Sequence, residues 1–269
     1  MPSCWRLIDT GPLDGPMNMA VDEALLESFD PAASLPVLRL YGWEPPAFSL
    51  GRFQQAEDAL CLERCVEAGI PVVRRITGGG VIYHAEELTY SIVCSPRHLS
   101  GGQGVKESFR ELTGFLLRFY KRLGLAASWA ADVCREEGRL GERTPLCFAG
   151  REEYDVVIGG RKIGGNAQRR LRERIFQHGS IPLRGALAAA LPLFRQVPPG
   201  LLEGTVSLRE LGVTEERPRL AELLAASFTE ALGVSLVRSE LTGEEADTAS
   251  RLRECRYLND TWNLQGVAP

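Results

Sequence analysis

Three segments of the chain carry residue types that could do chemistry, and the densest of them reads Arg-Arg-Ile-Thr-Gly-Gly-Gly-Val-Ile-Tyr-His over residues 74–84. Its three successive glycines allow the backbone to approach a ligand closely, and Arg75 supplies a fixed positive charge beside them. A phosphate group or a phosphopantetheine arm would fit such a loop. The pattern matches neither of the nucleotide-binding glycine motifs, however, so a flexible hairpin without a ligand explains it equally well.

The second segment combines a cysteine and a lysine, Cys147 and Lys162, which lie 162 − 147 = 15 residues apart. Lys162 is expected at the start of a strand, followed by Gly164 and Gly165, whose backbone leaves room for a carbonyl group. A free thiol has a pKa of about 8.5, so a neighbouring ammonium group that favours the thiolate is the usual way to activate it. The pair therefore predicts nucleophilic catalysis, while Cys147 taken alone is more simply a small core residue.

The third segment reads Gln-His-Gly-Ser over residues 177–180, and it follows a run, residues 169–174, in which four of the six residues are arginine and one is glutamate. That run predicts a local positive patch on an acidic chain, which suits an acidic protein partner. A solvated hairpin tip is the simpler interpretation of the composition. His178 is a candidate ligand-binding residue, and it could equally be a structural histidine whose hydrogen bonds are satisfied.

The elements that must position these segments are mainly strands in the middle of the chain, with helices before and after them. Strands are expected at residues 36–41, 47–50, 71–75, 81–83, 88–94, 154–158, 161–168, 175–183 and 234–237. Gly159 and Gly160 predict a two-residue hairpin turn. Helices are expected at 18–29, 105–123, 220–232 and 244–257, and Asp58 is expected to cap another over 59–68.

Strands grouped in the centre, without strict strand-helix alternation, predict an α+β fold with a mixed, largely antiparallel sheet flanked by helices. No repeat, low-complexity tract or clear linker divides the chain. We therefore expect a single domain over residues 1–269, with a core at about 5–185 and a helical tail at about 186–269.

The composition is ordinary for a soluble globular protein, with 44% hydrophobic and 25% charged residues among 269. It excludes the disordered, collagen-like and disulfide-scaffold classes. A formal net charge of −4 gives no nucleic-acid or membrane signature. The apolar run at 186–194 is too short to span a bilayer, no secretory signal is visible, and seven scattered cysteines suit reduced thiols. We expect a cytoplasmic protein that binds no nucleic acid and no membrane.

Taken in order, the Asn-Met-Ala-Val-Asp-Glu-Ala helix at 18–24 and the three segments above resemble the lipoate-protein ligase and octanoyltransferase family, whose catalytic domain is related to that of biotin-protein ligase. The resemblance covers about residues 5–185 and implies a mixed sheet flanked by helices. Ligases of this family use ATP to make an acyl-adenylate, whereas its octanoyltransferases take the acyl group from acyl carrier protein through a cysteine thioester. The context of Cys147 resembles the octanoyltransferases, and no separate C-terminal ligase accessory domain is expected.

The resemblance also implies roles for individual residues. Cys147 would be the nucleophile, and Lys162 would lower its pKa and orient the acyl carbonyl. Backbone donors near Gly165 and Asn166 would stabilise the developing oxyanion, and Asn166 stands where many relatives have Ser. The expected substrate-binding set consists of Arg75, Gly78, Gly79, Gly80, His84, Gly165, Asn166, Ala167 and His178.

The implied function is transfer of octanoate from octanoyl-acyl carrier protein, through a Cys147 thioester, to a lysine of a lipoyl domain. The acceptor would be a glycine-cleavage H protein or a dehydrogenase E2 subunit, and no cofactor would be needed. An ATP-dependent lipoate ligase, which needs ATP and Mg, and an amidotransferase that moves octanoate between lipoyl-domain proteins are alternatives.

Two interpretations from other classes stay open on the sequence alone. One is a non-catalytic protein that keeps the acyl pocket and docks carrier domains. The other is a zinc site made of Cys61, Cys65, Cys94 and His98, since both pairs have a spacing that can serve zinc. Cys61 and Cys65 lie one helical turn apart, however, and more simply join the buried face of a helix.

Overall fold

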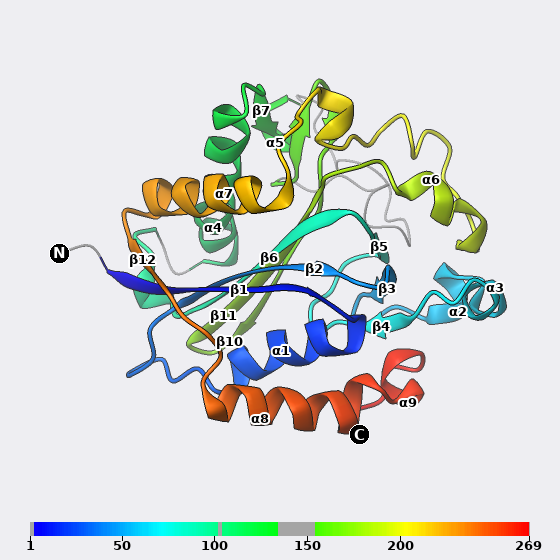
Figure 1. Cartoon of the computed structure of the whole chain (residues 1–269), viewed down its shortest axis with the longest axis horizontal. Coiled ribbons are helices and arrows are strands. Elements are labelled where there is room, and N and C mark those ends of the chain that lie inside the picture. Colours follow the sequence, from blue (N-terminus) through cyan, green and yellow to red (C-terminus); the bar gives the residue numbers. More distant parts are fainter. Residues whose placement is uncertain (1–2, 102–103, 134–153, 269) are drawn as a thin grey trace.

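The main sheet of the protein has six strands in the order β10-β11-β6-β2-β1-β12 (Figure 1). The computed structural model describes residues 3–101, 104–133 and 154–268. In the same spatial order, the strands span Asn166–Leu171, Arg174–Pro182, Glu87–Cys94, Val37–Trp43, Cys4–Leu13 and Ser235–Arg238. Pairing is antiparallel from β10 to β2, and β1 is parallel to both β2 and β12. The expected mixed, largely antiparallel sheet is confirmed.

Two small sheets accompany the main one. The first has the order β4 (Val72–Arg74), β3 (Ala47–Leu50), β5 (Ile82–His84), and the second has the order β7 (Ala127–Trp129), β8 (Val156–Ile158), β9 (Arg161–Lys162). The predicted Gly159-Gly160 hairpin between β8 and β9 is confirmed, with φ values of +56° and +76°.

The single strand expected over residues 161–168 is wrong, because the chain turns between β9 and β10. Gly164 adopts a φ of +91°, and an added Cβ there would lie only 1.9 Å from the carbonyl oxygen of Ser180. Only glycine fits this turn. It sends Lys162 into a small sheet and Asn166 into the main sheet.

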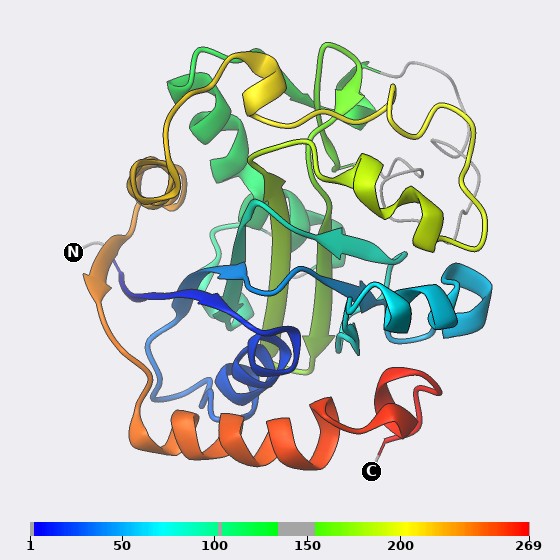
Figure 2. The same cartoon turned by 45° about the vertical axis from the view of Figure 1, so that its right-hand side comes forward.

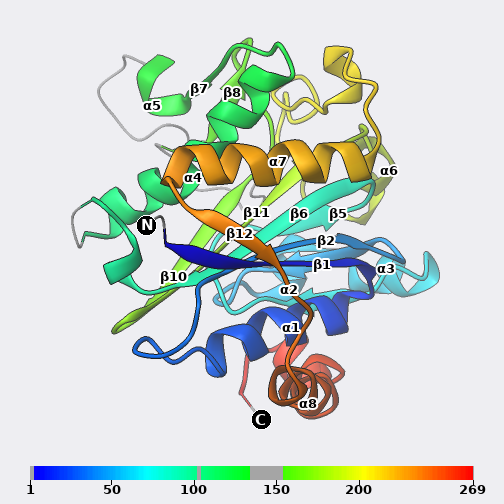
Figure 3. The same ribbon diagram turned by 60° about the vertical axis from the view of Figure 1, so that its left-hand side comes forward.

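Helices cover both faces of the main sheet (Figures 1 and 3). One face carries α1 (Gly15–Glu27) and α8 (Gly243–Leu252), and the other carries α4 (Val105–Arg122) and α7 (Arg217–Leu232). Helix α1 begins three residues before its expected start. The side chain of Asp14 accepts a 2.7 Å hydrogen bond from the Met17 N–H and caps the helix there.

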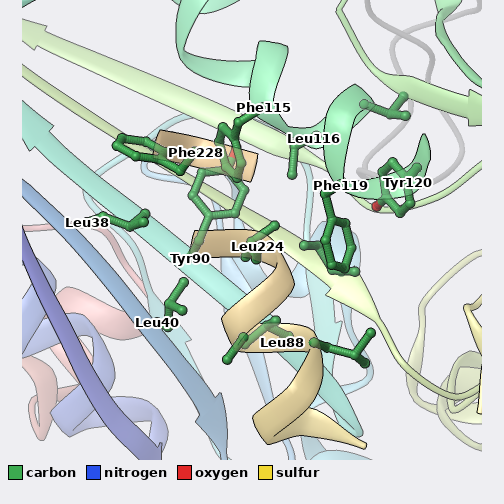
Figure 4. Close-up of a cluster of buried hydrophobic side chains, with 14 of the residues drawn as sticks. Leu38, Leu40, Leu88, Tyr90, Phe115, Leu116, Phe119, Tyr120, Leu224 and Phe228 are labelled. Carbon is green, nitrogen blue, oxygen red and sulfur yellow. The ribbon is translucent and has the colours of Figure 1, made fainter. Parts of the chain in front are cut away.

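The core between the main sheet and α4 and α7 is aromatic (Figure 4). Tyr90 of β6 packs edge to face on Phe115 of α4 with ring centroids 5.0 Å apart, and Phe115 packs on Phe228 of α7 at 5.2 Å. The helix expected over 105–123 is confirmed, and its side chains Leu112, Phe115, Leu116 and Phe119 are buried. A second apolar cluster lies between the other face of the sheet, α1 and α8. Because strand side chains alternate between faces, position along a strand decides which layer a residue meets.

The other helices are short: α2 (Ala56–Ala59), α3 (Leu62–Glu67), α5 (Ala130–Val133), α6 (Leu187–Ala190), α9 (Asp260–Asn263), 3-10 turns at Pro96–His98, Leu191–Leu193 and Arg209–Leu211, and the π turn η4 at Arg253–Tyr257. The single helix expected over 59–68 is wrong. Leu60 is extended (φ −127°, ψ 149°), and Asp58 lies within α2 rather than at a cap. No helix in the described ranges is long and apolar enough to cross a membrane.

Residues 186–269 are less helical than expected, and their elements are built into the rest of the fold. Strand β12 extends the main sheet beside β1, and α8 packs along α1. Helix α9 contacts β4 and lies on the same side of the molecule as α2 and α3 (Figure 2). The last elements of the chain therefore reach the segment that carries the glycines.

Candidate acyl-transfer site

The three glycines lie in a loop, residues 77–81, between β4 and β5; we name it the glycine loop. The guanidinium of Arg75 lies inside it and donates hydrogen bonds to the carbonyl oxygens of Ser49 (2.8 Å), Gly78 (2.9 Å) and Gly80 (2.7 Å). Arg75 is 1% exposed. The guanidinium of Arg75 therefore lies beside the glycines, as the sequence predicts, and its hydrogen bonds to two carbonyl groups of the loop fix the loop conformation.

The glycine loop also packs directly on the backbone of Gly51. An added Cβ at Gly51 would lie 2.0 Å from the carbonyl oxygen of Gly79, whose φ is +96°. By contrast, a Cβ at Gly78 would meet nothing within 4 Å. The Arg52 N–H donates a 2.8 Å hydrogen bond to the Thr77 carbonyl, which fixes the start of the loop. Sequence reasoning missed Gly51 because its partner lies far along the chain.

Arg74 anchors the strand before the loop to two distant segments. Its guanidinium donates six hydrogen bonds to main-chain carbonyls, those of Gly51, Arg52, Gln54, Trp262, Asn263 and Leu264. Burial lowers the pKa of Arg74, yet every bond goes to a carbonyl dipole rather than to a carboxylate. The loop after β3 and the α9 region are thereby joined behind the glycine loop.

His84 lies at the end of β5 in a fully bonded position. Its ring stacks on Trp43 (centroids 3.8 Å apart, 8° between planes), its Nδ1 lies 2.8 Å from Glu87 Oε1, and its Nε2 lies 2.7 Å from Ser49 Oγ. Ser49 Oγ already accepts a 3.1 Å hydrogen bond from Arg75. His84 and Arg75 are thus linked through Ser49.

A buried polar network continues from His84 through Glu87. This carboxylate also accepts hydrogen bonds from Thr89 and from Ser180 (2.7 Å). Glu87, Thr89 and Ser91 are alternate residues of an otherwise apolar strand, and all are buried. That alternation is a signal in the sequence which could have identified them, because polar residues on the inner face of a buried strand need partners.

His178 of β11 meets the glycine loop from the main sheet. Its Nε2 lies 2.8 Å from Thr77 Oγ1, and its Nδ1 lies 3.9 Å from a carboxylate oxygen of Asp22 on α1. Burial, together with the positive charge of Arg75 and the proximity of His84, holds the pKa of His178 well below its usual value. The imidazole is therefore neutral at neutral pH. The structure thus places His178, from the Gln-His-Gly-Ser segment, within hydrogen-bond distance of Thr77 in the glycine loop.

Asp22 is the centre of a second polar cluster, between α1 and the sheet. It accepts hydrogen bonds from Arg39 (2.7 Å), Ser91 (2.7 Å) and Tyr41 (2.8 Å). Asn18, one turn earlier on α1, accepts another from Arg39 at 2.8 Å. Arg39, a charged residue within the otherwise apolar strand β2, was a signal in the sequence that a buried acidic or polar partner exists. Sequence reasoning did not use this signal to find Asp22 and Asn18.

Lys162 of β9 forms a buried ion pair with Asp155. The Nζ to Oδ2 distance is 2.6 Å, and both side chains are at most 6% exposed. The Gly159-Gly160 hairpin brings these two residues together. Cys147, the expected nucleophile, lies outside the described residues, so the role of Lys162 toward it stays a prediction.

Gly165, Asn166 and Ala167 follow the Gly164 turn and enter β10. The Gly165 carbonyl accepts a 3.0 Å hydrogen bond from Ser180, and Ala167 pairs with His178 in the sheet. The side chain of Asn166 lies on the α4 side of the sheet, where its Oδ1 accepts a 2.7 Å hydrogen bond from Tyr90. The backbone of this segment thus lies beside His178, while the Asn166 side chain faces the other layer.

The arginine run does not form one patch. Arg174 donates to the carbonyls of Leu26 and Glu27 at the end of α1 (3.2 and 3.0 Å), whereas Arg169 reaches the Ile76 carbonyl (3.4 Å) at the glycine loop. Arg172 has a φ of +46° at the exposed hairpin turn.

The alternative interpretation, a zinc site made of Cys61, Cys65, Cys94 and His98, is wrong. Cys65 is buried on α3, where burial raises its thiol pKa to about 11, and Cys94 is buried in β6, in a different apolar cluster. In the part of the chain that the structure describes, no group of three or more His, Cys, Asp or Glu side chains is placed to hold a metal ion.

Comparisons with known proteins identify the family and the fold. The family model named Lipoyl protein ligase A/B catalytic domain matches residues 14–235. The chain is 40% identical over 273 residues to Octanoyltransferase LipM of Kyrpidia tusciae (97% of this chain, 98% of that protein). It is 35% identical over 274 residues to Octanoyltransferase LipM of Anoxybacillus flavithermus (97% and 98%). The solved structure of a bi-partite lipoate protein ligase from Thermoplasma acidophilum, described with its E2 lipoyl domain, has the same fold (TM-score 0.80, 23% identity, 99% and 98% covered).

Proposed function

Since the chain belongs to the lipoyl protein ligase A/B catalytic domain family, we propose that it is an acyltransferase of lipoate assembly, which moves an octanoyl group to a lysine of a lipoyl domain. One observation carries the choice of octanoyl transfer. The relative that is 40% identical over nearly the whole chain is named an octanoyltransferase. Within the proposal, octanoyl-acyl carrier protein is the donor, an H protein or E2 subunit is the acceptor, no cofactor takes part, and the reaction is cytoplasmic.

The proposed reaction is two acyl transfers in sequence. The Cys147 thiolate attacks the thioester carbonyl of the donor; a new carbon–sulfur bond forms, the old one breaks, and the donor leaves as a thiol. The acceptor lysine, as a free amine, then attacks the octanoyl-Cys147 thioester. An amide forms, the lysine nitrogen loses a proton, and Cys147 is released. Neither step needs ATP, because the donor thioester is already activated.

The chain's own residues support this proposal in three ways. Lys162 is a buried cation on β9, suited to stabilise a thiolate or to orient a carbonyl group. The glycine loop is held rigidly by Arg75 and Gly51, so it can present its backbone to a ligand without rearranging. His178 is neutral and tied to Thr77, and it therefore adds no charge where an octanoyl chain must be buried. Burying about six methylenes would contribute up to roughly 5 kcal/mol.

The test is the intact mass of the purified protein after incubation with octanoyl-acyl carrier protein and no ATP, beside the Cys147→Ala variant. We expect a gain of one octanoyl group that hydroxylamine removes and that the variant lacks. Melting temperatures of the two proteins serve as the control for folding. Octanoylation of the variant at the wild-type rate would refute the Cys147 thioester.

Two further incubations assign the donor. Octanoylated H protein replaces acyl carrier protein in one, and lipoate with ATP replaces it in the other. Acylation only from octanoylated H protein would make the protein an amidotransferase. Pyrophosphate release that depends on lipoate would make it a ligase.

A further inference from the structure

Three arginines from distant parts of the chain gather beside the glycine loop. Arg52 follows β3, Arg169 lies in β10, and Arg256 lies in η4. The guanidinium groups of Arg52 and Arg256 lie over the ring of buried Trp262, 5.5 and 5.0 Å from its centroid. The guanidinium of Arg169 donates to the carbonyl of Ile76, the residue directly before the glycine loop. We name Arg52, Arg169 and Arg256 the arginine cluster.

The arginine cluster carries more positive charge than its surroundings neutralise. Arg256 pairs with Glu23, and Tyr257 also donates to that carboxylate. Among the ion pairs of the described residues, none involves Arg52 or Arg169. Partial burial and the charges of Arg52 and Arg256 lower the pKa of Arg169, with Glu23 opposing them. Gathering like charges in a half-buried place costs free energy unless an anion binds there.

The arginine cluster also lies next to the site. Arg169 is two residues beyond Ala167, which pairs with His178, and it points to the same face of the sheet as His178. The Arg52 N–H bonds the Thr77 carbonyl. Seven residues separate Lys162 from Arg169, which limits their Cα atoms to about 25 Å apart. An extended pantetheine arm joins a thioester and a phosphate over a separation of this order.

We propose that the arginine cluster binds the phosphate ester of the acyl donor, and this inference rests on the proposed acyl-transfer function. Guanidinium groups are planar, stay charged, and match phosphate oxygens two at a time, which suits them to this ligand better than lysine. The same chemistry occurs in two donors, the phosphodiester of a phosphopantetheine arm and the phosphate of an acyl-adenylate. Glu23 and Trp262 hold two of the three side chains in place before the ligand arrives.

The first experiment measures binding alone, by calorimetry, with phosphopantetheine and with pantetheine, which lacks only the phosphate. Wild-type protein should bind phosphopantetheine at least about 10-fold more tightly, the factor expected for one or more charged hydrogen bonds. Arg52→Gln and Arg169→Gln should each remove most of that preference and leave pantetheine binding unchanged. Arg172→Gln is the matched control, since Arg172 is exposed at the hairpin turn, and it should keep the wild-type preference.

The second experiment measures KM for octanoyl-phosphopantetheine, octanoyl-pantetheine and octanoyl-adenylate. Arg52→Gln and Arg169→Gln should raise KM about 10-fold for octanoyl-phosphopantetheine and not for octanoyl-pantetheine. A rise confined to octanoyl-adenylate would assign the phosphate to an adenylate.

An equal loss with both pantetheine ligands, or no loss with either, would overturn the inference, because a structural role for these arginines predicts the same effect on both. Failure of all three octanoyl donors with wild-type protein would instead reject the proposed function. The calorimetric comparison would still decide whether the arginine cluster binds phosphate.

Discussion

Substitution of Gly51 by alanine tests whether the glycine loop is held rigidly for a ligand. The added Cβ would lie 2.0 Å from the Gly79 carbonyl oxygen, and an ordinary contact begins at 3.4 Å. The loop must therefore move by about 3.4 − 2.0 = 1.4 Å. Gly51 cannot easily retreat instead, because its own carbonyl accepts a hydrogen bond from Arg74.

The size of the expected effect follows from that displacement. A misplacement of about 1 Å in a positioned site can cost on the order of 100-fold in rate. We therefore expect Gly51→Ala to lower kcat/KM for octanoyl transfer to a lipoyl domain by about 100-fold, measured by the mass of the acceptor. Movement of Gly79 also strains the bonds from Arg75 to Gly78 and Gly80, each worth about 1.5 to 3 kcal/mol. The melting temperature should fall as well.

The matched control is the same chemical change at Gly114, in the middle of α4, where an added Cβ meets nothing within 4 Å. Gly114→Ala should keep wild-type activity and gain up to about 1 kcal/mol of stability, as expected for a helix interior. Wild-type kcat/KM in a folded Gly51→Ala protein would refute the reasoning, since the loop would then have accommodated 1.4 Å without consequence.

Three other predictions concern titratable groups of the site. Asp155→Asn should lower the free energy of unfolding by about 3 to 5 kcal/mol, because it leaves the buried Lys162 ammonium without its carboxylate. The double variant with Lys162→Met should recover most of that loss, because both charges of the ion pair are then removed. Denaturant titration measures both effects, and an Asp155→Asn protein of wild-type stability would contradict the prediction. Lys162→Ala should move alkylation of Cys147 to higher pH, followed by peptide mass, and an unchanged profile would remove the proposed role of Lys162. For His178, which faces Asp22, Arg75 and His84, the lowered folded-state pKa means that the unfolded chain takes up a proton first as pH falls below about 6.5. Wild-type stability should therefore fall below that pH by up to about 1.4 kcal/mol per pH unit from this group, and His178→Gln should show a shallower slope in urea titrations at pH 7.5, 6 and 5.

The elements that the sequence predicted well depend on local patterns. The helix expected over 105–123 and the Gly159-Gly160 turn are confirmed because helical periodicity and two adjacent glycines determine them within a few residues. The strand over 161–168 failed because Gly164 turns the chain, and that turn is needed only because Ser180, from another strand, lies against it. The Leu60 break in the expected helix over 59–68 likewise had no signal among its neighbours in the sequence.

The sequence predicted which residues belong to the candidate site better than it predicted how they are connected. The sequence identified Arg75, His84 and His178, and the structure brings all three together around the glycine loop. It did not identify Ser49, which connects Arg75 to His84, because a hydrogen bond across strands leaves no mark on the neighbours of Ser49 in the sequence. Glu87 did carry a signal, the alternation of polar residues along β6, which sequence reasoning did not use. The place of Asn166 was also unpredictable, since the face that its side chain takes depends on where the Gly164 turn ends.

The Arg74 hydrogen bonds bear on the order in which the site is completed during synthesis. Three of their carbonyl acceptors belong to residues 262–264, which are synthesised 188 to 190 residues after Arg74 itself. At about 5 to 20 residues per second, that interval is roughly 10 to 40 s. Until then the guanidinium lacks half of its bonding partners and the α9 region that covers it. A nascent chain can thus form most of the β-strands early, while the glycine loop reaches its final shape only after residues 262–264 have been synthesised.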